Sequence, residues 1–181
     1  LLAVASVVSR IYSWLASYDG LFIVGRSISA ILGAASVGAV WLIARALYQE
    51  KRTAFFAGFL VAFNFLYIQL SRFFAFDIVL AAMCLGTILS LIGIRKPYRW
   101  SHVFSTGIFL GLALATKISA LSLLIPIFVA VFFSEIKKPE GYNFAHRALL
   151  FLGISVIGVS VCILAEPYAV LDFARFMKDT N

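Results

Sequence analysis

Residues 148–165 read ALLFLGISVIGVSVCILA, a run without a single charged side chain. A run of this length and polarity is typical of a helix that crosses a lipid bilayer. Three further runs, at 25–46, 54–70 and 78–94, are also apolar, with Arg26 and Arg45 near the ends of the first. As a helix, the first of these would measure about 33 Å, which is enough to cross the hydrocarbon core of a membrane. The pattern therefore predicts several membrane-spanning helices.

The overall composition agrees with this interpretation. The chain has 181 residues, of which 63% are hydrophobic and only 13% charged, and its mean hydropathy is +1.03. So few charges cannot cover the surface of a soluble domain, and so many apolar residues exclude intrinsic disorder. The apolar runs are also continuous, whereas the strands of a membrane β-barrel alternate in polarity. We therefore expect an all-α fold, a polytopic transmembrane helix bundle.

The apolar stretch 102–133 admits two interpretations because one charged residue, Lys117, interrupts it. A single helix would bury Lys117 near the middle of the membrane, which is energetically costly. Two short helices would place Lys117 at a membrane surface. They would also put the loop with Lys137, Lys138 and Arg147 on the same side as the other basic loops. We favour two short helices, which brings the total to about six spans.

The chain divides into three expected parts. Residues 1–20 have apolar side chains at helical spacing, which predicts an amphipathic helix lying in the membrane interface; the alternative is the end of a transmembrane span. Residues 21–165 hold the transmembrane bundle, and residues 166–181 begin an outer loop. Because the first residue is Leu1 and not Met, we expect the sequence to be part of a longer protein.

The distribution of charge predicts an orientation. Lys and Arg are more frequent in the loops on one side of the expected bundle, and positively charged loops stay in the cytoplasm. The net charge of +7 then reflects membrane anchoring, and we expect no nucleic-acid partner. We expect a multi-pass integral membrane protein surrounded by lipid bilayer, in the plasma (inner) membrane of a bacterium or archaeon, with its basic loops in the cytoplasm.

Small residues at four-residue spacing predict the faces through which helices pack. In the first span they are Ala30, Ala34 and Gly38. In the segment that begins at 102 they are Gly107 and Gly111. Residues of this kind let two helix backbones approach closely and point to no chemistry of their own.

The middle of each span holds no charge, and its main polar exception is Asn64. Ion-coupled transporters usually keep ionisable groups near the midplane, so a site at the outer face fits this sequence better than a path across the membrane. The sequence contains no zinc-type Cys/His spacing, no phosphate-binding Walker loop and no nucleophile-elbow motif. A transporter or lipid flippase, and a non-catalytic membrane subunit, are the alternative interpretations.

The segment SRFFAFD at 71–77 is the most informative polar feature on the outer side. Arg72 ends one span and Asp77 begins the next, so a pocket in which the guanidinium holds a phosphate is one interpretation. The other is an Arg–Asp pair that merely closes a hairpin. Lys117, at the tip of another hairpin, is either a phosphate ligand or a snorkelling anchor. Two acidic residues after the last span either frame an outer cavity or lie in a solvated loop: Glu166 and Asp172.

Four short motifs occur in order along the chain. They are GRSISA (25–30), the segment at 71–77, GLALATK (111–117) and EPYAVLDF (166–173). In this order and spacing they resemble the dolichyl-phosphate-mannose–protein mannosyltransferase family in the broad sense, which includes the lipid A aminoarabinose transferases. The resemblance covers nearly the whole chain.

The resemblance implies a GT-C type of fold that lacks its first helix, with a site at the outer membrane face. It implies a glycosyltransferase that takes a sugar from a polyprenyl-phosphate donor and passes it to a protein, lipid or glycan acceptor. The sugar would move by direct displacement at its anomeric carbon, with the lipid phosphate as the leaving group. Fixed cations beside that phosphate would stabilise its growing charge.

The resemblance also implies roles for individual residues. Arg72 and Lys117 would hold the lipid phosphate, and Asp77 would shape the sugar or acceptor site. Arg26 and Asp172 complete the set expected to bind substrate or lipid phosphate. The catalytic acid of the family lies in an outer loop that would precede Leu1, so no catalytic residue is expected in the present sequence. A divalent metal is left open, and no other cofactor is expected.

Overall fold

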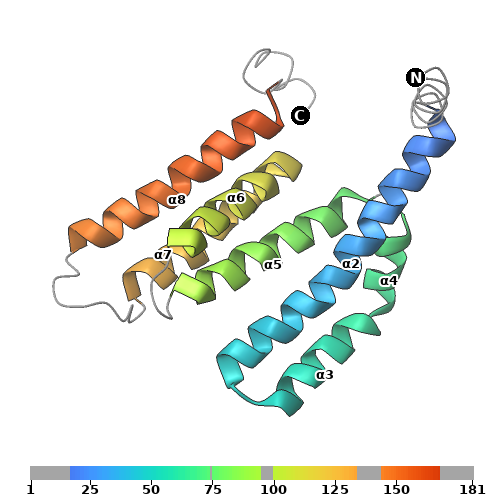
Figure 1. Ribbon diagram of the computed structural model, residues 1–181, viewed down its shortest axis with the longest axis horizontal. Helices are drawn as coiled ribbons and strands as arrows, with labels where there is room; N and C mark the ends of the chain where they lie inside the picture. The colour runs from blue at the N-terminus through green and yellow to red at the C-terminus, as the bar shows by residue number, and fades with distance from the viewer. Residues whose placement is uncertain (1–16, 74, 95–99, 134–143, 168–181) are drawn as a thin grey trace, which may run out of the picture.

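The computed structural model describes residues 17–73, 75–94, 100–133 and 144–167, and these residues fold into helices alone (Figure 1). The helices are α2 (Tyr18–Tyr48), α3 (Lys51–Ala62), α4 (Phe65–Arg72), α5 (Phe76–Ile94), α6 (Trp100–Thr116), the 3-10 helix η1 (Ile118–Leu123), α7 (Leu124–Phe133) and α8 (Phe144–Ala165). The expected all-α membrane bundle is confirmed. The proposed interfacial helix at 1–20 lies almost entirely outside the described residues, as does most of the outer loop at 166–181.

Three helices in the described part of the chain are long and apolar enough to cross a membrane by themselves: α2, α5 and α8. The helices α3 and α4 together would make a fourth span, with a bend of 57° between them. The two halves of the stretch 102–133 are apolar but shorter, at Trp100–Thr116 and Ile118–Phe133. Each of the six expected apolar segments is therefore helical, although not all have full spanning length.

The segment 54–70, predicted as the second span, consists of two helices joined at a bend of 57°. The helix ends at Ala62 and restarts at Phe65, because Asn64 acts as the N-cap of α4. Its side-chain oxygen accepts a hydrogen bond from the Tyr67 backbone N–H at 3.0 Å. A cap of this kind supplies a partner for a backbone group that lipid could not satisfy. The main polar residue within the spans thus marks the position of the bend.

The stretch 102–133 does divide into two helical segments, as favoured above. Helix α6 ends at Thr116, and Lys117 adopts an extended backbone (φ −160°, ψ 130°) before η1 begins. The Lys117 backbone N–H still donates to the Ala113 carbonyl, so the turn follows the last helical hydrogen bond without a gap. The helix therefore breaks at Lys117, the charged residue that a single helix would have buried in the membrane.

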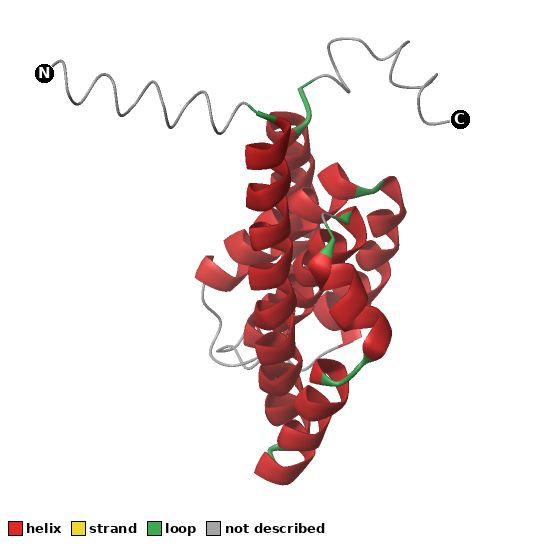
Figure 2. Cartoon of the chain, turned by 90° about the vertical axis from the view of Figure 1, so that its right-hand side faces the viewer, coloured by secondary structure: helices red, strands yellow, loops and turns green. Residues whose placement is uncertain are grey.

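Successive segments run in opposite directions, so the turns between them lie alternately at the two ends of the bundle (Figures 1 and 2). One end, which we call the Arg72 end, gathers the beginnings of α2 and α5 and the ends of α4, α6 and α8. The other, the Glu50 end, holds the turn between α2 and α3 and the beginnings of α6 and α8. This arrangement places Arg26, Arg72 and Lys117 at the same end, as the hairpin pattern predicted.

The core lies among α5, α6, α7 and α8. Its buried members are aliphatic side chains such as Ile94, Leu110, Ile127 and Ile154. An arginine on α8 adds a polar link to α7, because the Arg147 guanidinium donates to the Phe132 carbonyl. Many large apolar side chains elsewhere on the bundle are exposed, which suits helices that face lipid.

The glycines on α6 form a packing face, as predicted. A Cβ at Gly107 would lie 2.6 Å from Ile157 Cγ2, and one at Gly111 would lie 2.6 Å from Val161 Cβ, so only glycine permits the observed approach of α8. These contacts bring α6 and α8 together along the cavity described below.

The corresponding prediction for the first span is wrong. Ala30, Ala34 and Gly38 are exposed, and a Cβ at Gly38 would meet nothing within 4 Å. The buried small residues of α2 lie on a neighbouring stripe instead, which includes Ser29 and Gly33. A Cβ at Gly33 would lie 2.9 Å from Ser71 Cβ on α4. Because both stripes have the same spacing, the pattern alone did not distinguish them.

Candidate functional site

The two charged residues that flank the turn after α4 sit at favourable helix ends. Arg72 is the last residue of α4, and Asp77 lies in the first turn of α5. A cation near a helix C-terminus and an anion near a helix N-terminus are both stabilised by the helix dipole. The chain therefore holds both charges beside the same short turn.

Lys117 reaches across from the break after α6 to the beginning of α5. Its Nζ lies 3.6 Å from Asp77 Oδ1, and this ion pair joins two hairpins that are separate in the sequence. The side chains are 60% and 62% exposed, so the pair is open to the solution or to a ligand. An exposed ion pair contributes little to the stability of the fold, at most about 1 kcal/mol, so stability alone does not account for this one.

Arg26 approaches the same end of the bundle from α2. Its Nε donates a hydrogen bond of 2.8 Å to the Arg72 carbonyl, and its guanidinium lies 5.3 Å from the centre of the Phe22 ring. The sequence assigned Arg26 to ligand binding, whereas its observed partner is the backbone at the end of α4. No feature of the sequence could have revealed this contact, because the two residues are 46 positions apart.

A cavity of about 460 Å³ lies at the same end of the bundle as the ion pair. It is formed by α5, α6 and the end of α8, and its walls are Phe76, Val79, Met83, Leu112, Ala115, Thr116, Ala165 and Glu166. Phe76 and Thr116 are the chain neighbours of Asp77 and Lys117, respectively. Glu166 is half-buried and is one of its lining residues.

Two further predictions concern Asp172 and a divalent metal. Asp172 lies outside the described residues, so its role stays a prediction. Within the part of the chain that the structure describes, no group of three His, Cys, Asp or Glu side chains could hold a metal ion. The described residues therefore provide no ligand set for the divalent metal on which the sequence made no prediction. Two contacts are therefore established at the Arg72 end, that of Arg26 with the Arg72 carbonyl and that of Lys117 with Asp77.

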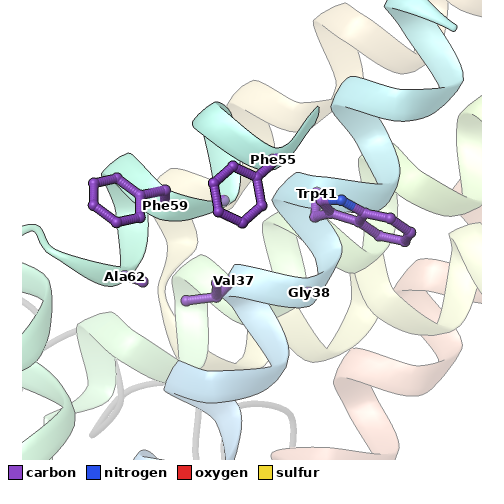
Figure 3. A pocket seen from close by; sticks show the side chains of 7 residues that line it. Val37, Gly38, Trp41, Phe55, Phe59 and Ala62 are labelled. Carbon is purple, nitrogen blue, oxygen red and sulfur yellow. The ribbon is translucent and has the colours of Figure 1, made fainter. Parts of the chain in front are cut away.

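Another groove has a very different chemical character. Figure 3 shows it between α2 and α3, where Val37, Trp41, Phe55, Phe59 and Ala62 surround it. Its volume is about 380 Å³, and Gly38 and Gly58 form the rest of its wall. A surface of this kind suits hydrocarbon and offers no carboxylate or cation to a sugar or phosphate. The cavity at the Arg72 end differs because it combines an apolar wall with Thr116 and Glu166.

Comparison with known proteins identifies a family. The family described as dolichyl-phosphate-mannose-protein mannosyltransferase matches residues 18–163, which is well over half of the chain. No curated protein and no solved structure matches the chain. The match runs from the first residue of α2 to residue 163, near the end of α8, and includes Arg26, Arg72, Asp77 and Lys117 within its limits. It favours a membrane glycosyltransferase over the transporter and the non-catalytic subunit.

Proposed function

The chain belongs to the dolichyl-phosphate-mannose-protein mannosyltransferase family, and we propose that its Arg72 end binds a polyprenyl-phosphate sugar and passes the sugar to an acceptor. The membrane glycosyltransferase activity follows from the family. The lipid-linked donor, the position of the site at the outer face and the roles of the residues below are our proposal. The observation that carries it is that two contacts between segments distant in the sequence, Arg26 with the Arg72 carbonyl and Lys117 with Asp77, lie at the same end of the bundle.

The proposed reaction is a displacement at the anomeric carbon of the donor sugar. An acceptor oxygen forms a bond to this carbon as the bond from the carbon to the phosphate oxygen breaks. The electron pair of the broken bond goes to the lipid phosphate, whose negative charge therefore grows in the transition state. Cations fixed beside it lower the barrier, because they need no reorganisation when the charge develops.

Lys117 and Arg72 are the proposed phosphate ligands. Lys117 is already paired with Asp77, at 3.6 Å, with most of its side chain exposed. Arg72 is exposed at the end of α4, where a guanidinium can form two parallel hydrogen bonds to a phosphate. Asp77 has a double role in this proposal, because it orients Lys117 and borders the site of the sugar or acceptor. Asp172 is assigned to the same site.

The base that takes the acceptor proton is assigned, on the earlier resemblance, to an outer loop preceding Leu1. The described residues then form the donor side of the site. A divalent cation that bound there would supply further positive charge to the phosphate, but no step of the proposal depends on it.

The test uses membranes isolated from cells that express the protein from its complete reading frame. Dolichyl phosphate-mannose with a labelled sugar is the probe, and transfer to endogenous membrane acceptors is measured. We expect Arg72→Ala to reduce transfer by a factor of about 10² to 10³ while membrane insertion is unchanged. Arg52→Ala, an exposed arginine at the Glu50 end, is the matched control and should keep full activity. Near wild-type transfer by Arg72→Ala would reject the assignment of the phosphate site.

A further inference from the structure

The cavity beside the ion pair has the chemical make-up of a carbohydrate site. Its volume, about 460 Å³, lies within the range of about 300–1,000 Å³ usual for small-molecule sites. Most of its wall is aliphatic, and two polar side chains stand at one edge, Thr116 and Glu166. Sites for small molecules typically have this form, with an apolar lining and a few polar groups that fix orientation.

The polar groups of this cavity can meet the hydroxyl groups of a sugar. The Glu166 carboxylate is half-buried, and when ionised it accepts hydrogen bonds only. The Thr116 hydroxyl already donates to the Leu112 carbonyl at 2.7 Å, which leaves its oxygen able to accept. Both groups therefore suit a ligand that brings several O–H donors, and a sugar ring is such a ligand.

The apolar part of the cavity suits the other face of the same ligand. Phe76 stands at the mouth with 66% of its surface exposed, so its ring is accessible to a ligand. Val79 and Met83 continue the wall along α5. A pyranose ring presents C–H groups on its faces, which pack against aromatic and aliphatic surfaces. The apolar groove of Figure 3 could accept these C–H groups but has no carboxylate for the hydroxyls.

The position of the cavity matches the connectivity of the proposed donor. In a polyprenyl-phosphate sugar, a single oxygen atom joins the phosphorus to the anomeric carbon. The sugar subsite must therefore adjoin the phosphate subsite. The residues before Lys117 and Asp77 in the sequence, Thr116 and Phe76, both line the cavity, so the backbone of each ion-pair residue adjoins it.

We propose that the cavity between α5, α6 and α8 binds the sugar ring of the donor, with Glu166 accepting hydrogen bonds from its hydroxyl groups. This inference rests on the proposed function, because it assumes that the lipid phosphate lies at Lys117 and Arg72. It adds the sugar subsite and a specificity-determining residue. Glu166 is here a binding residue, and its carboxylate takes no part in bond formation.

The experiment measures equilibrium binding of three lipids to the complete protein in detergent. The probes are dolichyl phosphate-mannose, dolichyl phosphate-glucose and dolichyl phosphate without a sugar. We expect the wild-type protein to bind at least one sugar-bearing lipid about tenfold more tightly than dolichyl phosphate, because charge-assisted hydrogen bonds to the sugar add to the phosphate contacts. Glu166→Gln should lose most of this preference while its affinity for dolichyl phosphate stays unchanged.

Two further variants complete the design. Ala165→Leu adds volume at an exposed position of the cavity wall and should also remove the preference, independently of the carboxylate. Glu50→Gln makes the same chemical change as Glu166→Gln at the opposite end of the bundle, and it should keep the wild-type preference.

The other outcomes overturn either the sugar subsite or the proposed function. If the wild-type protein binds all three lipids equally, the phosphate site stands and the sugar subsite is wrong. The sugar subsite is also wrong if neither Glu166→Gln nor Ala165→Leu reduces the preference. If the wild-type protein binds none of the three lipids, the proposed function itself fails.

Discussion

The guanidinium of Arg26 holds the end of a helix that lies 46 residues further along the chain. Its Nε donates to the Arg72 carbonyl at 2.8 Å, and Arg72 is the last residue of α4. The final carbonyl groups of a helix have no partner within the helix, so this contact satisfies one of them. Arg26 thereby fixes the position of the backbone that carries the proposed phosphate ligand.

We therefore predict that Arg26 acts by positioning Arg72. Removing a hydrogen bond from a charged donor typically costs about 1.5–3 kcal/mol, so Arg26→Ala should reduce sugar transfer by at least about tenfold. Arg45→Ala, near the other end of α2, removes a guanidinium that lies 5.4 Å from the Trp41 ring and serves as the matched control. Transfer from dolichyl phosphate-mannose by the complete protein is the measurement.

A second comparison separates positioning from direct binding. Arg26→Gln removes the charge but keeps an N–H donor at the place of Nε, so it should retain clearly more transfer than Arg26→Ala if the hydrogen bond to Arg72 is what matters. Equal losses in Arg26→Gln and Arg26→Ala would instead mean that the positive charge is required, and the positioning role would be abandoned.

The ion pair between Lys117 and Asp77 allows the binding role to be separated from hairpin closure. Exchanging the two charges, with Asp77→Lys and Lys117→Asp combined, keeps the attraction between the hairpins. Because both side chains are about 60% exposed, we expect the melting temperature to change little. Sugar transfer should fall by a factor of about 10² to 10³, because the cation no longer stands where the phosphate charge develops.

The outcome of this exchange decides between the two interpretations of the turn at 71–77. If the single variants lose transfer and the exchanged pair recovers it, the pair serves only to join the hairpins. Melting temperature and transfer rate, measured on the same preparations, distinguish these cases.

The gathering of charges at one end of the bundle could be predicted from the sequence. Apolar segments of similar length, joined by short turns, must alternate in direction, and this brought Arg72 and Lys117 to the same end. The break at Lys117 followed from the high cost of a charge in the middle of a membrane. These predictions depend on the cost of placing a charge inside a membrane and on the direction of each span, and neither depends on how the helices pack.

The finer contacts could not be predicted, because they depend on how helices are rotated against one another. Two stripes of small residues on α2 have the same spacing, and only packing decides that Gly33 faces a neighbour while Gly38 does not. The contact of Arg26 with the Arg72 carbonyl likewise depends on that rotation. The bend at Asn64 did have a signal in the sequence, since this was the main polar residue inside a span.

The glycine contact between α6 and α8 should be intolerant of even one methyl group. A Cβ at Gly111 would lie 2.6 Å from Val161 Cβ and would also meet the Gly158 carbonyl, so Gly111→Ala must push the helices apart. Overpacking of this kind typically costs about 1–3 kcal/mol. Gly38→Ala is the matched control, because that position is open and alanine favours the helix.

Thermal unfolding in detergent measures this difference through the two thiols, Cys84 and Cys162, which are partly buried in the native bundle. A thiol-reactive dye should label them at a lower temperature in Gly111→Ala than in the wild-type protein. Equal midpoints for Gly111→Ala and Gly38→Ala would contradict the close approach of α6 to α8.

The bend at Asn64 connects the middle of the bundle to the proposed site. Asn64 caps α4 through the hydrogen bond from the Tyr67 N–H, and α4 ends at Arg72. Asn64→Ala removes the cap at a typical cost of about 1 kcal/mol, whereas Asn64→Ser keeps a side-chain oxygen that can accept the same bond. Because the 57° bend determines the direction of α4, we expect Asn64→Ala to reduce sugar transfer severalfold and Asn64→Ser to restore most of it. If the two variants lost transfer equally, the cap would not be what aims Arg72 at the site, and the bend would have to be attributed to the packing of α4 against α2.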